Sequence, residues 1–200
     1  VEMVFNLSDP MLGVLPHQST ATTAPNCFLQ GFNTHIINVQ YAGDQHLFGI
    51  CLQPHMVKSL LGILPSECKD TLIDLTLLSS SFNSLWHRLK EAASFEERVN
   101  LIEQAFPFLD QTDCARTKYF CSLFANTTDQ QLPSIDSLSK EICYSSRQLN
   151  RKSQSLFGIS TEELLVHKKF RNAVTLMHGS KKPLTSIAYD AGFYDQAHFC

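Results

Sequence analysis

The sequence lacks a run of 18 apolar residues, and its first ten residues, VEMVFNLSDP, lack a basic segment followed by an apolar core. From these absences we expect that the sequence contains no membrane span and no secretory signal. With 200 residues, 44% of them hydrophobic and 18% charged, the chain is neither disordered nor collagen-like and can bury one or two modest cores. Because it does not begin with methionine and opens within an expected strand, we expect a fragment that is incomplete at its start.

The sequence also lacks the motifs of metal and nucleotide sites. Its seven cysteines never form a CxxC pair, which argues against a disulfide framework and a four-thiolate zinc site and favours a reducing, cytoplasmic setting. No P-loop, GxGxxG or GxSxG motif is present. The histidines of the N-terminal half, His17, His35, His46 and His55, are neither paired as HxH nor placed near a glutamate in a repeating arrangement. We therefore expect no catalytic residue, no metal and no cofactor, with a cupin-type metal-dependent enzyme as an alternative.

The charge is distributed unevenly along the chain. The net charge of -3 is the sum of -6 over residues 1–129, with 13 acidic and 7 basic side chains, and +3 over residues 130–200, with 6 acidic and 9 basic. Residues 137–189 alone carry 9 basic and 3 acidic side chains, or +6. Such a concentration suits contact with phosphates, although a solvated basic surface would have the same composition.

The N-terminal half has the alternating pattern of β-strands. Apolar residues alternate from Val1 to Leu7, with Val4 as the exception, whereas residues 9–26 have no periodicity and predict a mobile loop. Further strands are predicted over 27–32, 36–41 and 47–52, the last two joined as a hairpin through residues 42–45.

Helix signals dominate the rest of the chain. Pro54 predicts the start of a short helix that ends at Gly62, and everything from about Ser84 onward has helical character. Ser94 and Glu97 have capping-box spacing, as do Ser160 and Glu163, and the second pair opens the longest helix, expected over about 161–178.

We predict an α+β chain with a partial β-rich N-terminal domain. The expected division is a β-rich effector or dimerisation domain over 1–83, a helical connector over 84–129 and an all-α domain over 130–200. The polar segment 126–133 is the expected linker, because it lacks an apolar stripe.

Two windows of the basic half repeat one pattern at an offset of 49 residues. Each has a short apolar helix, a tight turn and a polar helix start, over residues 135–151 and 184–199. Ser139 corresponds to Ala188, and Cys143 corresponds to Gly192. The pattern predicts a duplicated helix-turn-helix, in which a small residue is needed where the two helices cross.

The second helix of such a unit enters the major groove, which is about 12 Å wide. In the first helix-turn-helix, one helical face holds Arg147, Asn150 and Arg151 and leaves Leu149 toward the core. Arginine can bond bidentately to guanine and asparagine to adenine, so this face can read bases.

These residues resemble the DNA-binding domain of the AraC/XylS transcription regulators over 134–200. The matching segments are SSRQLNR at 145–151, FGIS at 157–160, KFRNA at 169–173 and, most specifically, IAYDAGFYDQAHF at 187–199. The resemblance implies two helix-turn-helix units joined by the long helix, with recognition helices set for successive major grooves. It also places base contacts in the second helix-turn-helix at Gln196 and His198.

Phosphate contacts are expected from four lysines chosen by charge and position, Lys152, Lys168, Lys181 and Lys182, and from Ser145, Ser146 and Gln148. The resemblance implies double-stranded DNA as partner. A small-molecule effector, a second copy of the chain and RNA polymerase are further candidate partners.

Several positions depart from the family pattern. Ser153 stands where the family usually has a buried phenylalanine, Cys143 replaces the usual turn glycine, and Lys169 holds a position that is commonly arginine. We expect the first helix-turn-helix to be packed more loosely than is usual in the family. The sequence ends at Cys200, within the expected second recognition helix, so weaker DNA binding than that of a longer chain is expected.

The N-terminal half is similar, less specifically, to the cupin-like effector domains of some AraC-like regulators. The segments concerned are EMVFNL at 2–7, LQG at 29–31, FGICLQP at 48–54 and LLG at 60–62. The resemblance implies sensing or dimerisation. Together the patterns predict a bacterial-type, cytoplasmic, sequence-specific transcription regulator, with a helical interaction module that does not bind DNA as the second alternative.

Overall fold

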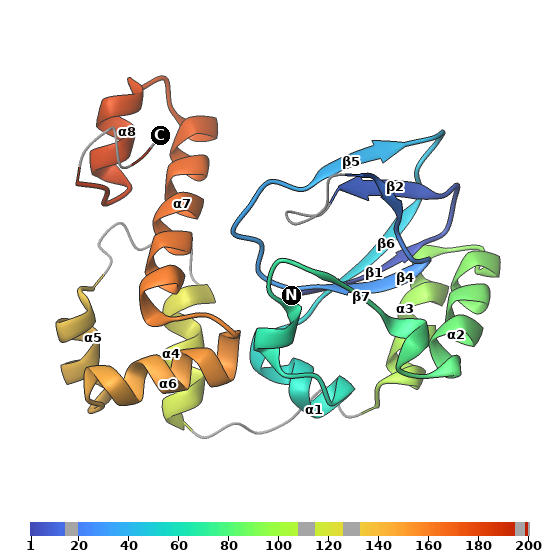
Figure 1. Ribbon diagram of the computed structural model, residues 1–200, viewed down its shortest axis with the longest axis horizontal. Helices are drawn as coiled ribbons and strands as arrows, with labels where there is room; N and C mark the ends of the chain where they lie inside the picture. Colours follow the sequence, from blue (N-terminus) through green and yellow to red (C-terminus); the bar gives the residue numbers. More distant parts are fainter. Residues whose placement is uncertain (15–19, 108–114, 126–132, 195–198, 200) are drawn as a thin grey trace. The chain divides into compact units, whose positions relative to one another are not determined.

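The computed structural model describes residues 1–14, 20–107, 115–125, 133–194 and 199. The chain separates into two compact units, one formed by Val1–Gln111 with Ser155–Gly158 and the other by Thr112–Gln154 with Ile159–Cys200. Antiparallel sheets dominate the N-terminal part of the chain and helices the rest, which confirms the predicted α+β class (Figure 1).

Two antiparallel sheets form the β-rich part of the first unit. The four-stranded sheet has the order β6-β1-β4-β7, formed by Leu47–Cys51, Glu2–Asn6, Cys27–Gln30 and Leu72–Asp74. The three-stranded sheet has the order β3-β2-β5, formed by Thr22–Thr23, Met11–Val14 and Asn38–Tyr41. In Figure 1 the two sheets are drawn in blue to teal.

Strand β1 lies inside the larger sheet and is buried on both faces. Met3 and Phe5 belong to the main apolar core, whereas Val4 packs in a smaller cluster with Met11 and Phe28. This accounts for Val4, the exception in the alternating pattern, because its side of the strand is covered as well.

Two predictions for this half, a loop and a hairpin, were wrong. Residues 9–26 contain strands β2 and β3, which are short and pair through backbone hydrogen bonds that a periodicity search does not detect. Strands β5 and β6 do not form a hairpin: β5 pairs with β2, and β6 pairs with β1. Residues 42–45 therefore carry the chain from one sheet to the other.

Helices complete the first unit. A 3₁₀ turn, Pro54–Met56, leads into α1, Val57–Leu61, which ends at Gly62 with φ of 73°, as predicted. Further 3₁₀ turns follow at Pro65–Cys68 and Leu75–Leu77, before α2, Ser80–Glu91, and α3, Phe95–Ala105.

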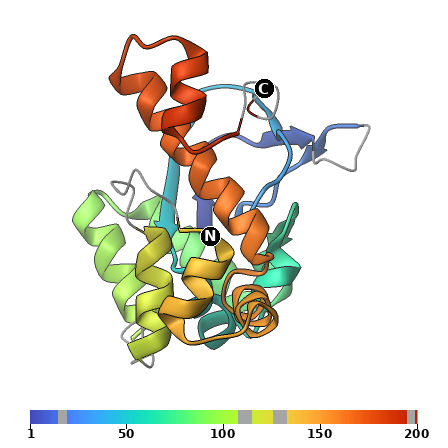
Figure 2. The same ribbon diagram turned by 90° about the vertical axis from the view of Figure 1, so that its left-hand side faces the viewer.

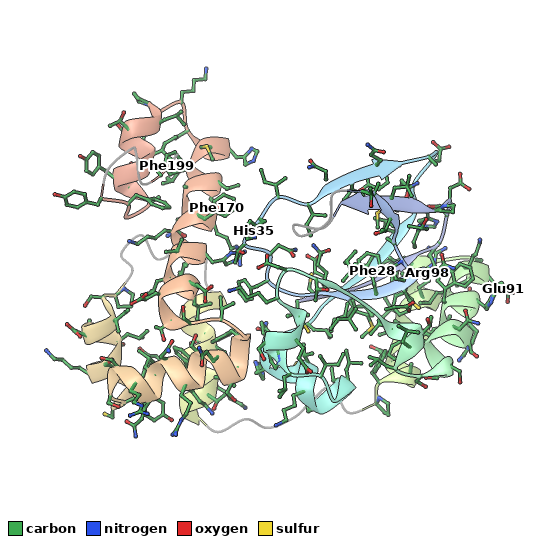
Figure 3. All side chains as sticks on the ribbon, in the orientation of Figure 1. Phe28, His35, Glu91, Arg98, Phe170 and Phe199 are labelled. Carbon is green, nitrogen blue, oxygen red and sulfur yellow. The ribbon has the colours of Figure 1, made fainter. Side chains whose placement is uncertain are left out.

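Helices α2 and α3 pack against the sheet. Phe82 and Leu89 of α2 and Ile102 of α3 share the core that contains Phe5. Figure 3 labels Arg98 on α3, whose guanidinium donates to the carbonyls of Leu89 and Ala92 at 3.0 Å each and so satisfies the end of α2. The boundaries predicted at residues 83 and 129 stay predictions.

The second unit contains α4, Ala115–Ala125, α5, Ile135–Ile142, all but the last three residues of α6, Ser146–Phe157, then α7, Thr161–Gly179, and α8, Leu184–Asp190. Figures 1 and 2 both show α8 beside the end of α7, in orange and red. The Tyr119 hydroxyl of α4 donates to the Glu141 carboxylate of α5, which raises the pKa of Tyr119. Among the described residues, no helix is long and apolar enough to cross a membrane.

Candidate nucleic-acid interface

The backbone of the second unit contains the duplication that the sequence predicts. After α5, Tyr144 N–H donates to Ser139 C=O at 3.0 Å, and after α8, Phe193 N–H donates to Ala188 C=O at 2.9 Å. A second pair matches too: Cys143 to Lys140 at 3.3 Å and Gly192 to Tyr189 at 2.9 Å. All four residues of one turn correspond to those of the other at an offset of 49. Both helices thus end in the same Schellman-type turn.

Both turns need a left-handed residue. Cys143 has φ of 58° and Gly192 has φ of 89°. Only glycine adopts this region without a steric penalty, so the cysteine at the first turn is strained and the glycine at the second is not. The small residues predicted at the helix crossings, Ser139 and Ala188, are both buried.

The predicted first recognition helix, α6, starts from a reciprocal cap. Ser145 Oγ accepts from Gln148 N–H at 3.3 Å, and Gln148 Oε1 accepts from Ser145 N–H at 2.9 Å and from its hydroxyl at 3.0 Å. The spacing S-x-x-Q is a capping-box signal that sequence reasoning missed at this position. Ser145 and Gln148, predicted phosphate contacts, thus hold the helix start, and Ser146 beside them is exposed.

Arg147 and Arg151 are exposed one turn apart on α6, while Leu149 is fully buried. The predicted division of the helix into a basic outer face and an apolar inner face is therefore present. Lys152 follows on α6 and is partly exposed. Two planar guanidiniums on one helix face can each form bidentate hydrogen bonds with guanine or phosphate.

Asn150 has a different environment. Its Oδ1 accepts from the backbone N–H of Thr161 at 3.1 Å, and its side chain is only partly exposed. Bidentate readout of adenine needs both the oxygen and the nitrogen of the amide. The structure therefore separates Asn150 from the two arginines with which the sequence grouped it.

The other three predicted phosphate-binding lysines differ in exposure and in partner. Lys181 is exposed, whereas Lys182 is exposed and forms an ion pair of 2.7 Å with Asp190 of α8. Lys168 is only 6% exposed, so neighbouring residues cover most of its side chain. A phosphate contact by Lys168 stays a prediction.

A small apolar core holds the second helix-turn-helix. Ala173 of α7 packs with Ile187, Ala188, Ala191 and Phe193. The Phe193 and Phe199 rings lie 5.3 Å apart at 65°, and Lys169 Nζ lies 5.9 Å from the Phe193 ring centre. Figure 3 labels Phe199 beside α8. Gln196 and His198, the base contacts implied by resemblance, lie outside the described residues.

Burial also acts on the helix that joins the two helix-turn-helix motifs. His167 on α7 has its pKa lowered from the ordinary value by burial and by the nearby positive charge of Arg171.

Of the four histidines considered as metal ligands, His17 lies outside the described residues. Within the described ranges, no three His, Cys, Asp or Glu side chains cluster as metal ligands.

The family comparison agrees with this geometry. Residues 138–200 match a family model described as a helix-turn-helix domain. A solved structure, that of a lysine-to-alanine variant of apo ToxT from Vibrio cholerae, is similar with 16% identity and a TM-score of 0.47, over 99% of this chain and 82% of that chain. No curated protein matches the sequence.

The duplicated turns, the exposed arginines and the matched domain define a DNA-binding transcription regulator. Its helix-turn-helix domain is of the AraC type, which confirms the predicted resemblance to the AraC/XylS family.

Proposed function

We propose that this chain binds double-stranded DNA with sequence specificity by placing α6 in the major groove. The observation that carries the proposal is the exposed pair Arg147 and Arg151 on a helix whose opposite face is anchored by Leu149. A helix held this way presents its N-terminal side chains to base edges, as recognition helices do. Arg147 and Arg151 are then the base-reading residues of the first helix-turn-helix.

Phosphate contacts position such a helix without reading sequence. We assign them to Ser146, Lys152, Lys181 and Lys182, which are exposed or partly exposed. In the second helix-turn-helix, Gln196 and His198 stay the proposed base contacts, supported by the resemblance alone. The first unit would regulate binding, through a small-molecule effector or through dimerisation, in a cytoplasmic protein.

The test starts by selecting bound sequences from random duplexes with the whole chain. Fluorescence anisotropy on the selected duplex then compares the wild type with Arg151→Ala and Arg147→Ala. Each variant should lose about 1–3 kcal/mol of binding free energy and relax its preference at one position, because a bidentate base contact is removed. Arg88→Ala, an exposed arginine of α2 in the first unit, removes the same charge and should bind normally.

A salt titration separates DNA binding from the alternative of a helical interaction module. For a DNA binder, log K falls linearly with log salt, and Lys152→Ala should reduce the slope by about 0.9, equally on all sequences. A wild type whose affinity does not respond to salt would contradict the proposal, as would an unchanged preferred sequence in both arginine variants.

A further inference from the structure

The first turn of α7 presents backbone donors that need partners. The first four N–H groups of a helix have no acceptor within the helix. Ser160 Oγ accepts from Glu163 N–H at 3.1 Å, and Glu163 Oε2 accepts from Ser160 N–H at 2.9 Å, so the capping box predicted here is present. It leaves the N–H of Thr161, a residue only 2% exposed, without a partner from its own helix. A buried N–H without an acceptor is costly.

Asn150 of α6 supplies that acceptor, with its Oδ1 3.1 Å from Thr161 N. The donor is a backbone amide, so the oxygen of the Asn150 side chain, and not its nitrogen, must face it. Successive helix residues are about 100° apart around the axis, which places Asn150 between buried Leu149 and exposed Arg151. Turning α6 so that Asn150 faces outward would break this bond.

We propose that Asn150 is a positioning residue that fixes the angle between α6 and α7, and not a base-reading residue. Helix α7, Thr161–Gly179, is about 28 Å long at 1.5 Å per residue and leads to the second helix-turn-helix. A bond between its first residue and α6 therefore sets how far apart, and at what phase, the two helix-turn-helix motifs meet DNA. Asn150 acts through Thr161, the first residue of α7. The positioning role rests on the proposed DNA binding, whereas the bond itself does not.

Hydrogen exchange of the whole chain tests the bond without DNA. Asn150→Ala should speed exchange of the Thr161 amide by about tenfold, which corresponds to one lost hydrogen bond, and should leave the Leu164 amide within the helix nearly unchanged. Asn150→Asp keeps an oxygen at the same place and puts a negative charge at a helix N-terminus, so it should restore protection. Gln154→Ala, at an exposed position of α6, is the matched control. Unchanged Thr161 exchange in Asn150→Ala would overturn the proposal.

Duplexes with one base pair inserted or removed between the two contacted segments test the positioning. The wild type should lose affinity sharply when the spacing changes, and Asn150→Ala should tolerate the change better while it selects the same bases. If Asn150→Ala instead relaxes the preference at a single A·T pair, Asn150 reads a base and the positioning role is wrong. If the wild type binds no duplex, the proposed function fails together with the positioning role, and the exchange experiment still decides the bond separately.

Discussion

The two helix-turn-helix motifs have the same backbone turn and different ways of stabilising it. In the first motif the left-handed position is Cys143, in the second Gly192. The residue after it is the partly exposed Tyr144 in the first and the buried Phe193 in the second. The acid that precedes each turn at the equivalent helix position also differs in its partner: Glu141 accepts from Tyr119, and Asp190 pairs with Lys182. Backbone hydrogen bonds therefore define the motif, and side chains determine how stable each copy is.

The largest difference should come from the aromatic residue after each turn. Phe193→Ala removes a ring packed against Phe199 and Ala173 and should cost about 3 kcal/mol of unfolding free energy. Tyr144→Ala, at the equivalent and partly exposed position, should cost about half as much, because less apolar area is lost. Urea denaturation of both variants measures this. Equal losses would show that the second turn does not depend more strongly on its aromatic residue.

Exchanging the left-handed residues should move stability in opposite directions. Cys143→Gly should stabilise the chain by about 1 kcal/mol, and Gly192→Ala should destabilise it by about the same amount. A Cβ at position 192 would meet Lys169 only at 3.7 Å, so the loss arises from the backbone conformation and not from a clash. Cys143→Ala, which removes the thiol but keeps the Cβ, is the control and should give no gain. Thermal unfolding of the three variants is the measurement.

The first motif also contains a buried hydroxyl. Ser153 is fully buried, and among the described residues its Oγ has no hydrogen-bond partner. Ser153→Ala removes this unsatisfied group and should raise the unfolding free energy by about 1 kcal/mol. Ser155→Ala, at an exposed position on the same helix, should leave the urea midpoint unchanged. A loss of stability in Ser153→Ala would mean that the hydroxyl is satisfied in solution.

The smallest effect on stability is expected at the acid of the second motif. Asp190→Asn breaks an exposed ion pair and should change the unfolding free energy by less than about 0.5 kcal/mol. DNA affinity should rise at low salt, because a negative charge is lost and the Lys182 ammonium is released for phosphate contact. In a chain that also carries Lys182→Ala, most of this gain should disappear. A weaker DNA affinity in Asp190→Asn would argue against phosphate contact by Lys182.

The helical half was predicted more accurately than the β-rich half. The helices α5, α7 and α8 begin at the predicted residues, because the serine caps of α5 and α7 and the period of 3.6 are local signals. Strand pairing is not local: β5 and β6 are neighbours in sequence and belong to different sheets. A short strand such as β3, Thr22–Thr23, has too few residues to show alternation.

The candidate site shows a similar limit. Sequence spacing correctly placed Arg147 and Arg151 on the exposed face of α6 and Leu149 inside. It could not show that Asn150 faces Thr161, eleven residues away, because that contact depends on the packing of α6 against the start of α7. Burial of Lys168 was missed for the same reason: charge and helical position alone do not reveal which face a neighbouring element covers.

The double burial of strand β1 has a consequence for pairing register. In a strand with one wet face, a slip by one residue would expose apolar side chains, and this penalty keeps the register. Over Met3, Val4 and Phe5 of β1 a slip would exchange one apolar side chain for another, so the penalty there is weak. The buried Asn6 supplies the missing specificity. Its side-chain nitrogen donates to the Asp9 carbonyl at 2.8 Å, and its side-chain oxygen accepts from the Ser8 N–H. Its backbone carbonyl accepts from the Trp86 indole N–H at 2.6 Å. One polar residue at the end of the strand thus distinguishes the native alignment from its neighbours.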